Sequence, residues 1–125
     1  MYEQEIDILN KLYVKLSVNG WKRGSNKRLS GKCPRCLLET LDLIINESDW
    51  DQKVIKANNN VEDLMRDFIA SEDPSGKFGM VPGDNSSASI IVWNDYKHRN
   101  INHVFKLIDK CLSYYLSELS RNDTN

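Results

Sequence analysis

The chain has 125 residues and a formal net charge of −1, and 40% of its residues are hydrophobic while 28% are charged. This size and balance are typical of one soluble globular domain, and no apolar run approaches the roughly 20 residues that a membrane span needs. We therefore expect residues 1–125 to form a single helical domain without a membrane contact. A secretory signal carries basic residues at its N-terminus, whereas this chain has acids there, which favours a cytoplasmic protein.

Two helices are predicted before residue 47. Residues 3–17 place apolar side chains three and four positions apart, and Asn19-Gly20 supplies a stop. Residues 21–32 are rich in Gly, Ser and Lys without any period, which predicts a loop. Pro34 suits the first turn of a helix because its missing N–H needs no partner there, so we expect a second helix over about 34–46.

The next stretch is predicted to hold a short helix followed by a longer one. Ser48 offers an N-cap with acids in the first turn, and Trp50 belongs to the apolar stripe of this short helix. The run Asn58-Asn59-Asn60 is expected to break it and to cap the next helix, which begins at Val61.

The C-terminal part is predicted to contain a long loop and the longest helix. Residues 71–89 hold two of the three prolines and three of the six glycines, which predicts a functional loop or lid. The β-branched run that follows is compatible with a short extended segment at 89–93, a strand or the start of a helix. Asn100 is expected to cap a final helix of about five turns. The predicted fold class is therefore mainly α, a compact bundle of four to five helices.

Two of the three cysteines, Cys33 and Cys36, have a spacing that can share one tetrahedral Zn²⁺ ion. Two further ligands are needed, and His98 and His103 are the candidates. In the alternative, one cysteine is a small core residue and the other lies near a helix start, where the helix dipole favours a thiolate. We favour this alternative, with no metal and no cofactor. An odd number of cysteines also argues for a reducing compartment.

The charge is unevenly distributed along the chain. Residues 21–36 contain six lysines and arginines and no acid, so the rest of the chain carries the acid excess. Basic side chains neutralise phosphates and the indole of Trp21 can stack on a base, so nucleic-acid binding through 22–35 is one hypothesis. Attraction to an acidic protein surface or to a nucleotide phosphate accounts for the same residues.

A second polar cluster precedes the last helix, between Trp93 and Arg99. Aromatic faces, an amide and a guanidinium are suited to binding a nucleotide, whereas the simpler interpretation is a helix-start device in which Asn94 caps a turn and Asp95 pairs with Arg99. No catalytic residue is predicted, because no nucleophile lies in a known motif context. The predicted residues for binding a ligand or partner are Trp21, Lys22, Arg23, Trp93, Asn94, Asp95, His98 and Arg99.

Several short motifs are spread over most of the chain. They are Gly20-Trp21 with Gly24, Cys33 leading into Leu37-Leu38, Ile91-x-Trp93-Asn94-Asp95, and a closing helix with Val104 and Leu107. Together they resemble a family of small phage and bacterial proteins catalogued only as a domain of unknown function. The chain departs from that family at Cys36 and Leu37, where the family has Gly-Ala, and at Asn100, where it has Thr. The resemblance implies a mobile-element setting, and it implies that the residues of interest are Trp21, Cys33, Trp93, Asn94, Asp95 and Arg99.

These observations favour a non-catalytic cytoplasmic binding protein over an enzyme. The first hypothesis is a small immunity or anti-defence antagonist that binds and neutralises a toxin or a nuclease, and so has a protein partner. The alternative is a module that binds a nucleotide or a small phosphate ligand through Trp21, Trp93, Asn94 and Arg99. A second alternative is a zinc or nucleic-acid binding domain that uses the cysteine pair and the basic segment.

Overall fold

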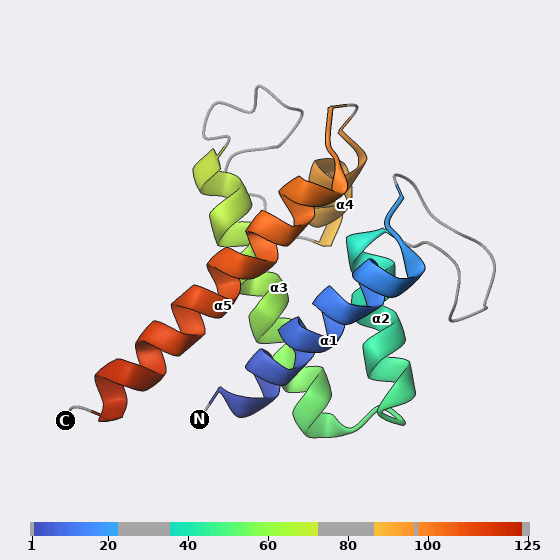
Figure 1. The fold of residues 1–125 in the computed structure, drawn as a ribbon. Helices are drawn as coiled ribbons and strands as arrows, with labels where there is room; N and C mark the ends of the chain where they lie inside the picture. The colour runs from blue at the N-terminus through green and yellow to red at the C-terminus, as the bar shows by residue number, and fades with distance from the viewer. Residues whose placement is uncertain (1, 23–35, 73–86, 97, 124–125) are drawn as a thin grey trace.

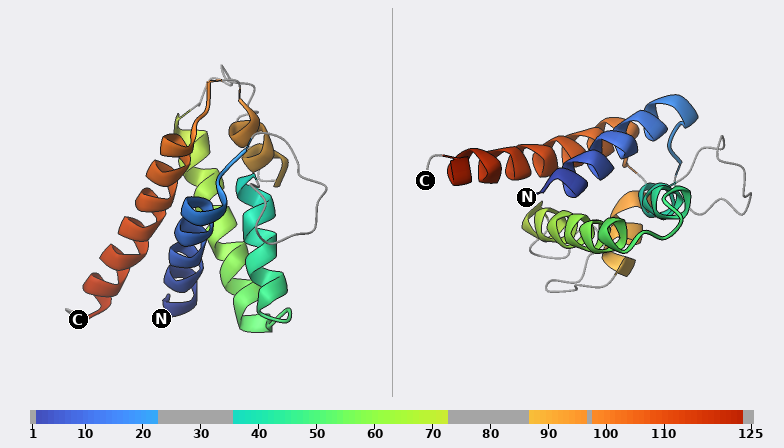
Figure 2. Two further views of the ribbon diagram at one scale, coloured as in Figure 1. Left: turned by 45° about the vertical axis from the view of Figure 1, so that its right-hand side comes forward. Right: turned by 90° about the horizontal axis from the view of Figure 1, so that it is seen from below.

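Five α-helices make up the computed structural model of the chain over the residues that it describes, which are 2–22, 36–72, 87–96 and 98–123. Helices α1 and α5 lie side by side (Figure 1), and a view from below shows them as one layer against a second layer of α2, α3 and α4 (Figure 2). The predicted mainly α bundle is confirmed. The helices are α1 (Glu3–Asn19), α2 (Leu37–Glu47), α3 (Gln52–Glu72), α4 (Ser87–Asp95) and α5 (Ile101–Asp123).

One hydrophobic core joins all five helices. Each helix contributes a stripe of apolar side chains, represented by Leu12 in α1, Leu41 in α2, Met65 in α3, Ile90 in α4 and Ile108 in α5, all fully buried. Burying one such side chain contributes about 1.5–3 kcal/mol. The three–four spacing read from the sequence therefore corresponds to the faces that the helices turn toward one another.

Helix α1 ends where the sequence predicts. The N–H of Gly20 bonds to Leu16 O at 3.0 Å, and Gly20 has a φ of 87°. Glycine adopts a positive φ without steric cost, so this residue lets the chain turn away from the helix. The predicted stop at Asn19-Gly20 is confirmed.

Helix α2 begins later than predicted. Its first residue is Leu37, and Pro34 lies outside the described residues. Cys36 is the N-cap, with extended backbone, and its Sγ accepts a hydrogen bond from Glu39 N at 3.4 Å. The Glu39 carboxylate in turn accepts from Cys36 N at 3.4 Å, which completes a capping box. The prediction of a helix from residue 34 is therefore wrong, because this box sets the start at residue 37.

The predicted break at Asn58-Asn59-Asn60 is wrong, because α3 runs through it without interruption. Asn58 Nδ2 donates to Glu62 Oε2 at 2.6 Å, one turn along the same helix. Asn60 Nδ2 donates to Glu5 Oε1 on α1 at 3.1 Å. Since both amides find side-chain partners in the helical conformation, they do not compete for the backbone as free asparagines do.

Of the three alternatives for residues 89–93, the helix is the correct one and the extended segment is wrong, because these residues belong to α4. Ile90 and Trp93 are buried while Ile91 and Val92 are exposed, which is the pattern of one helical face against the core. The predicted loop at 71–89 is narrower than expected, since residues 71–72 belong to α3 and residues 87–89 to α4. The remainder of that loop lies outside the described residues.

The predicted cap of the last helix is confirmed. Asn100 Oδ1 accepts hydrogen bonds from Asn102 N at 2.9 Å and from His103 N at 3.2 Å. His103 Nδ1 accepts from Asn100 N at 3.1 Å, so the cap is reciprocal. None of the helices in the described ranges is long and apolar enough to cross a membrane.

Candidate functional site

Asn94 stands at the centre of the predicted site and is completely buried. Its Oδ1 accepts two hydrogen bonds, from Trp21 Nε1 at 2.6 Å and from Leu37 N at 3.0 Å. Its Nδ2 donates to Lys22 O at 3.2 Å and to Asp95 Oδ1 at 3.0 Å. One amide therefore joins the segment after α1, the first residue of α2 and the end of α4.

The structure brings Trp21 and the Trp93–Arg99 segment together, as the sequence predicts. Both the indole N–H of Trp21 and the amide of Asn94 are engaged inside the protein. Asn94 does act as a cap, but for the N-terminus of α2, which is 57 positions away in the sequence. The spacing of neighbouring residues cannot predict a cap between distant segments, so the sequence pattern predicts only a local turn at Asn94.

Arg99 lies over an aromatic surface beside this network. Its Nε donates to Trp93 O at 2.8 Å, and its guanidinium carbon is 4.1 Å from the centroid of the Trp93 ring and 5.5 Å from that of Tyr96. Burial lowers the pKa of the Arg99 guanidinium, an effect that Glu72 and Tyr96 oppose, and arginine stays charged. The described contacts of these two residues are the bond from Arg99 to the Trp93 carbonyl and the bond that Asp95 Oδ1 accepts from Asn94.

Trp93 also fastens α4 to the neighbouring helices. Its ring is buried, and its Nε1 donates to Glu72 Oε2 on α3 at 3.3 Å. The same carboxylate accepts from Lys110 Nζ on α5 at 3.0 Å. The carboxylate of Glu72 thus links Trp93 of α4 and Lys110 of α5 to α3. Of the other predicted residues, exposed His98 stacks its ring edge-on against Tyr96 at 5.3 Å.

Two of the four predicted zinc ligands, Cys36 and His103, are engaged in helix caps. Cys36 is buried in the capping box of α2, and burial raises the pKa of its thiol to about 11. His103 Nδ1 is engaged in the cap of α5. Cys33 and the predicted binding residue Arg23 lie outside the described residues. Within the described ranges, no three His, Cys, Asp or Glu side chains are grouped to hold a metal ion.

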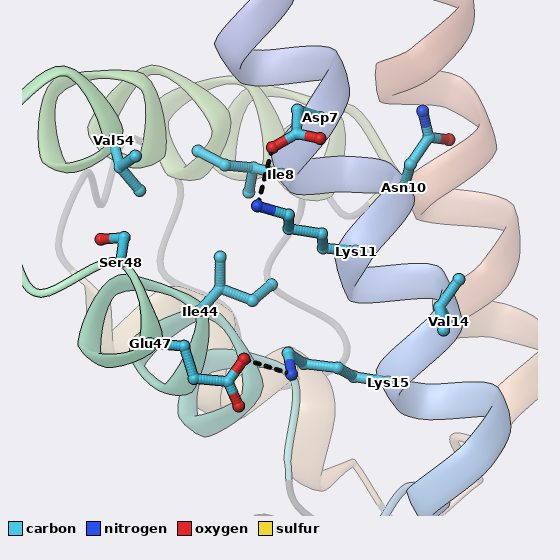
Figure 3. Close-up of a pocket in the computed structure, with 10 residues that line it drawn as sticks. All are labelled: Asp7, Ile8, Asn10, Lys11, Val14, Lys15, Ile44, Glu47, Ser48 and Val54. Atoms are coloured by element: carbon cyan, nitrogen blue, oxygen red, sulfur yellow. Dashed lines mark ion pairs between the residues drawn. The ribbon is translucent and has the colours of Figure 1, made fainter. Parts of the chain in front are cut away.

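A groove that the sequence pattern does not indicate lies between α1, α2 and the start of α3, with a volume of about 440 Å³. Ile8 of α1 and Ile44 of α2 face the space between the two helices, and Val54 of α3 closes one end (Figure 3). Ile8 and Ile44 belong to the core and form the floor. Because Ile44 and Val54 belong to apolar stripes that the sequence predicts, periodicity alone gives no sign of an opening.

Two ion pairs frame the groove. Lys11 Nζ is 2.9 Å from Asp7 Oδ2 along α1, and Lys15 Nζ is 2.6 Å from Glu47 Oε2, which links α1 to α2 across the groove (Figure 3). The lysine stems add apolar surface to the walls while their ammonium groups remain paired. All four charged residues that line the groove are thus paired with one another.

The turn between α2 and α3 adjoins this groove, because Ser48 lines it. Asp49 and Trp50 both have left-handed backbone, with φ of 57° and 59°. Ser48 Oγ donates to Ile45 O at 2.6 Å and Trp50 N donates to the same oxygen at 3.2 Å, which holds the turn. The prediction that Ser48 caps a helix containing Trp50 is wrong, since Asp51 Oδ1 accepts from the first turn of α3 and Trp50 is 60% exposed.

The comparisons with known proteins identify neither the Asn94 network nor the groove. Comparison with protein-family models, with curated proteins and with solved structures gives no match for this chain. The resemblance to a phage family therefore stays a prediction, and the geometry of the described residues carries the proposals below.

Proposed function

We propose that this chain is a non-catalytic binding protein with a protein partner, an immunity or anti-defence antagonist that binds and neutralises a toxin or a nuclease. The observation that carries the proposal is Trp50, whose side chain is 60% exposed in a turn of left-handed backbone. Tryptophan is among the residues that contribute most binding energy at protein interfaces. An exposed indole beside an apolar groove is the arrangement expected of an interface without its partner.

Folding alone does not favour tryptophan at this position. Left-handed backbone costs a non-glycine residue roughly 1–2 kcal/mol, and glycine or asparagine takes up that conformation more readily. Trp50 carries this cost while most of its side chain gains nothing from burial. Backbone strain of this kind is concentrated at functional sites, and binding of a partner accounts for it here.

The charges next to Trp50 fit a basic partner. Asp49 and Asp51 flank Trp50, and both are exposed. A nuclease presents a basic surface to the phosphates of its substrate. An acidic surface centred on a tryptophan would cover such a region and compete with the nucleic acid.

The test is capture of a partner from cells of the native host by the tagged chain, comparing wild type with Trp50→Ala. Tyr114→Ala is the matched control, because Tyr114 is another exposed aromatic residue and lies on α5. We expect one protein in stoichiometric amount with the wild type and the control, and its loss with Trp50→Ala. Equal retention by Trp50→Ala, or no stoichiometric protein with the wild type, would contradict the proposal.

A further inference from the structure

We infer that the groove between α1, α2 and α3 receives one uncharged apolar side chain of the partner, and that basic residues flank this side chain on the partner. The inference rests on the proposed function and names the kind of segment that the chain recognises. Trp50 lies in the turn whose Ser48 lines the groove.

The floor of the groove favours an apolar occupant. Ile8 and Ile44 lie at its base and Val54 at its end (Figure 3). Its volume of about 440 Å³ falls in the range of pockets that enclose small ligands. An aliphatic or aromatic side chain placed there would remove its own apolar surface and that of the walls from water.

The two ion pairs disfavour a charged occupant. Each ammonium of Lys11 and Lys15 already has a carboxylate within 3 Å, from Asp7 and Glu47. A charged group that entered would lose its water without finding an unpaired opposite charge on the walls. The groove is therefore suited to a neutral side chain, although charged residues surround it.

Charge complementarity specifies what lies beside the occupant. Asp49 and Asp51 are exposed on either side of Trp50 in the turn next to the groove. Carboxylates at the rim of an interface attract basic residues of the partner and repel acidic ones. The segment that fits is an apolar residue with lysine or arginine beside it.

The test uses the full chain labelled with ¹⁵N and two capped tripeptides as probes, acetyl-Lys-Leu-Arg-amide and acetyl-Glu-Leu-Asp-amide. We expect the basic peptide to shift the amide signals of Ile8, Ile44 and Val54, with a Kd about threefold or more below that of the acidic peptide, the effect expected of two exposed charge pairs. Val14→Arg places a charge on the groove wall and should abolish these shifts. Val18→Arg is the matched control and should leave them, because Val18 is 76% exposed one turn further along α1, away from the lining residues.

The inference is overturned if the basic peptide leaves the groove signals unmoved at saturating concentration, if the acidic peptide binds as well, or if Val14→Arg binds like the wild type. The peptide test and the capture test can fail separately. If the basic peptide binds in the groove but no protein is captured, the groove inference stands and the antagonist role is contradicted. If a partner is captured and lost with Trp50→Ala but the peptide does not shift the groove signals, only the groove inference is contradicted.

Discussion

A single buried amide has an unusual share of the polar contacts in this molecule. Asparagine carries two donors and one oxygen with two lone pairs, and Asn94 uses all four. An apolar residue of similar size would leave the Leu37 N–H and the Trp21 N–H without an acceptor. Each orphaned buried donor costs about 1–3 kcal/mol, so this residue contributes more to folding than its side-chain volume suggests.

Asn94→Ala is therefore expected to lower the free energy of unfolding by about 3 kcal/mol, since it orphans two donors. Asn59→Ala is the matched control, because Asn59 is exposed on α3, where alanine is the better helix former and a gain of about 0.5 kcal/mol is expected. Urea unfolding of both variants measures the difference. A loss at Asn94 no larger than about 1 kcal/mol would show that the network is not needed for stability.

At the scale of elements, the start of α2 depends on a cysteine that acts as a cap. Cys36 Sγ accepts from Glu39 N, and burial keeps this thiol protonated by raising its pKa to about 11. We expect Cys36→Ala to lose about 1 kcal/mol of unfolding free energy, and Cys36→Ser to lose less because its hydroxyl is a good capping acceptor. Thermal unfolding of the two variants measures the difference. Equal losses for both would show that packing of the sulfur matters and capping does not.

The mainly α fold could be predicted because α1, α2 and α5 each carry a clear apolar stripe. The division of the rest into helices could not, because α3 joins two predicted helices and α4 covers a run that also fits a strand. Their boundaries could not always be predicted, since several depend on contacts between segments. The run at Asn58-Asn59-Asn60 signals a break locally, but in the folded state Glu62 and Glu5 accept hydrogen bonds from the Nδ2 groups of Asn58 and Asn60. Similarly, Pro34 suits a helix start, but the capping box at Cys36 decides the position.

Prediction of the candidate sites is limited in the same way, because they depend on contacts between distant segments. The Trp93–Arg99 cluster could be predicted because unusual side chains are concentrated within seven residues, although the sequence did not distinguish a network that joins helices from a ligand site. The groove combines residues from α1, α2 and α3, so no single segment of the sequence predicts it. The sequence pattern places Trp50 in an apolar stripe, because periodicity does not reveal a left-handed turn.

At the scale of the whole molecule, stability and recognition are separated in space. The Asn94 network joins α4 to the start of α2, and Figure 1 shows the α2–α3 turn at the opposite end of the bundle from α4. Substitutions in the turn therefore leave the network and most of the core intact. Changes at sites this far apart, without shared partners, are expected to be additive.

The most direct measurement of the central claim is the stability of Trp50→Gly and Trp50→Asn, since it asks whether folding needs this indole. Glycine relieves roughly 1–2 kcal/mol of left-handed strain and adds about 0.5–1 kcal/mol of backbone entropy to the unfolded state. The predicted result in urea unfolding is an unfolding free energy unchanged or raised by up to about 1 kcal/mol for glycine, and no significant loss for asparagine. A loss of more than about 1 kcal/mol in both variants would contradict the account, because Trp50 would then be a packing residue and not a binding surface.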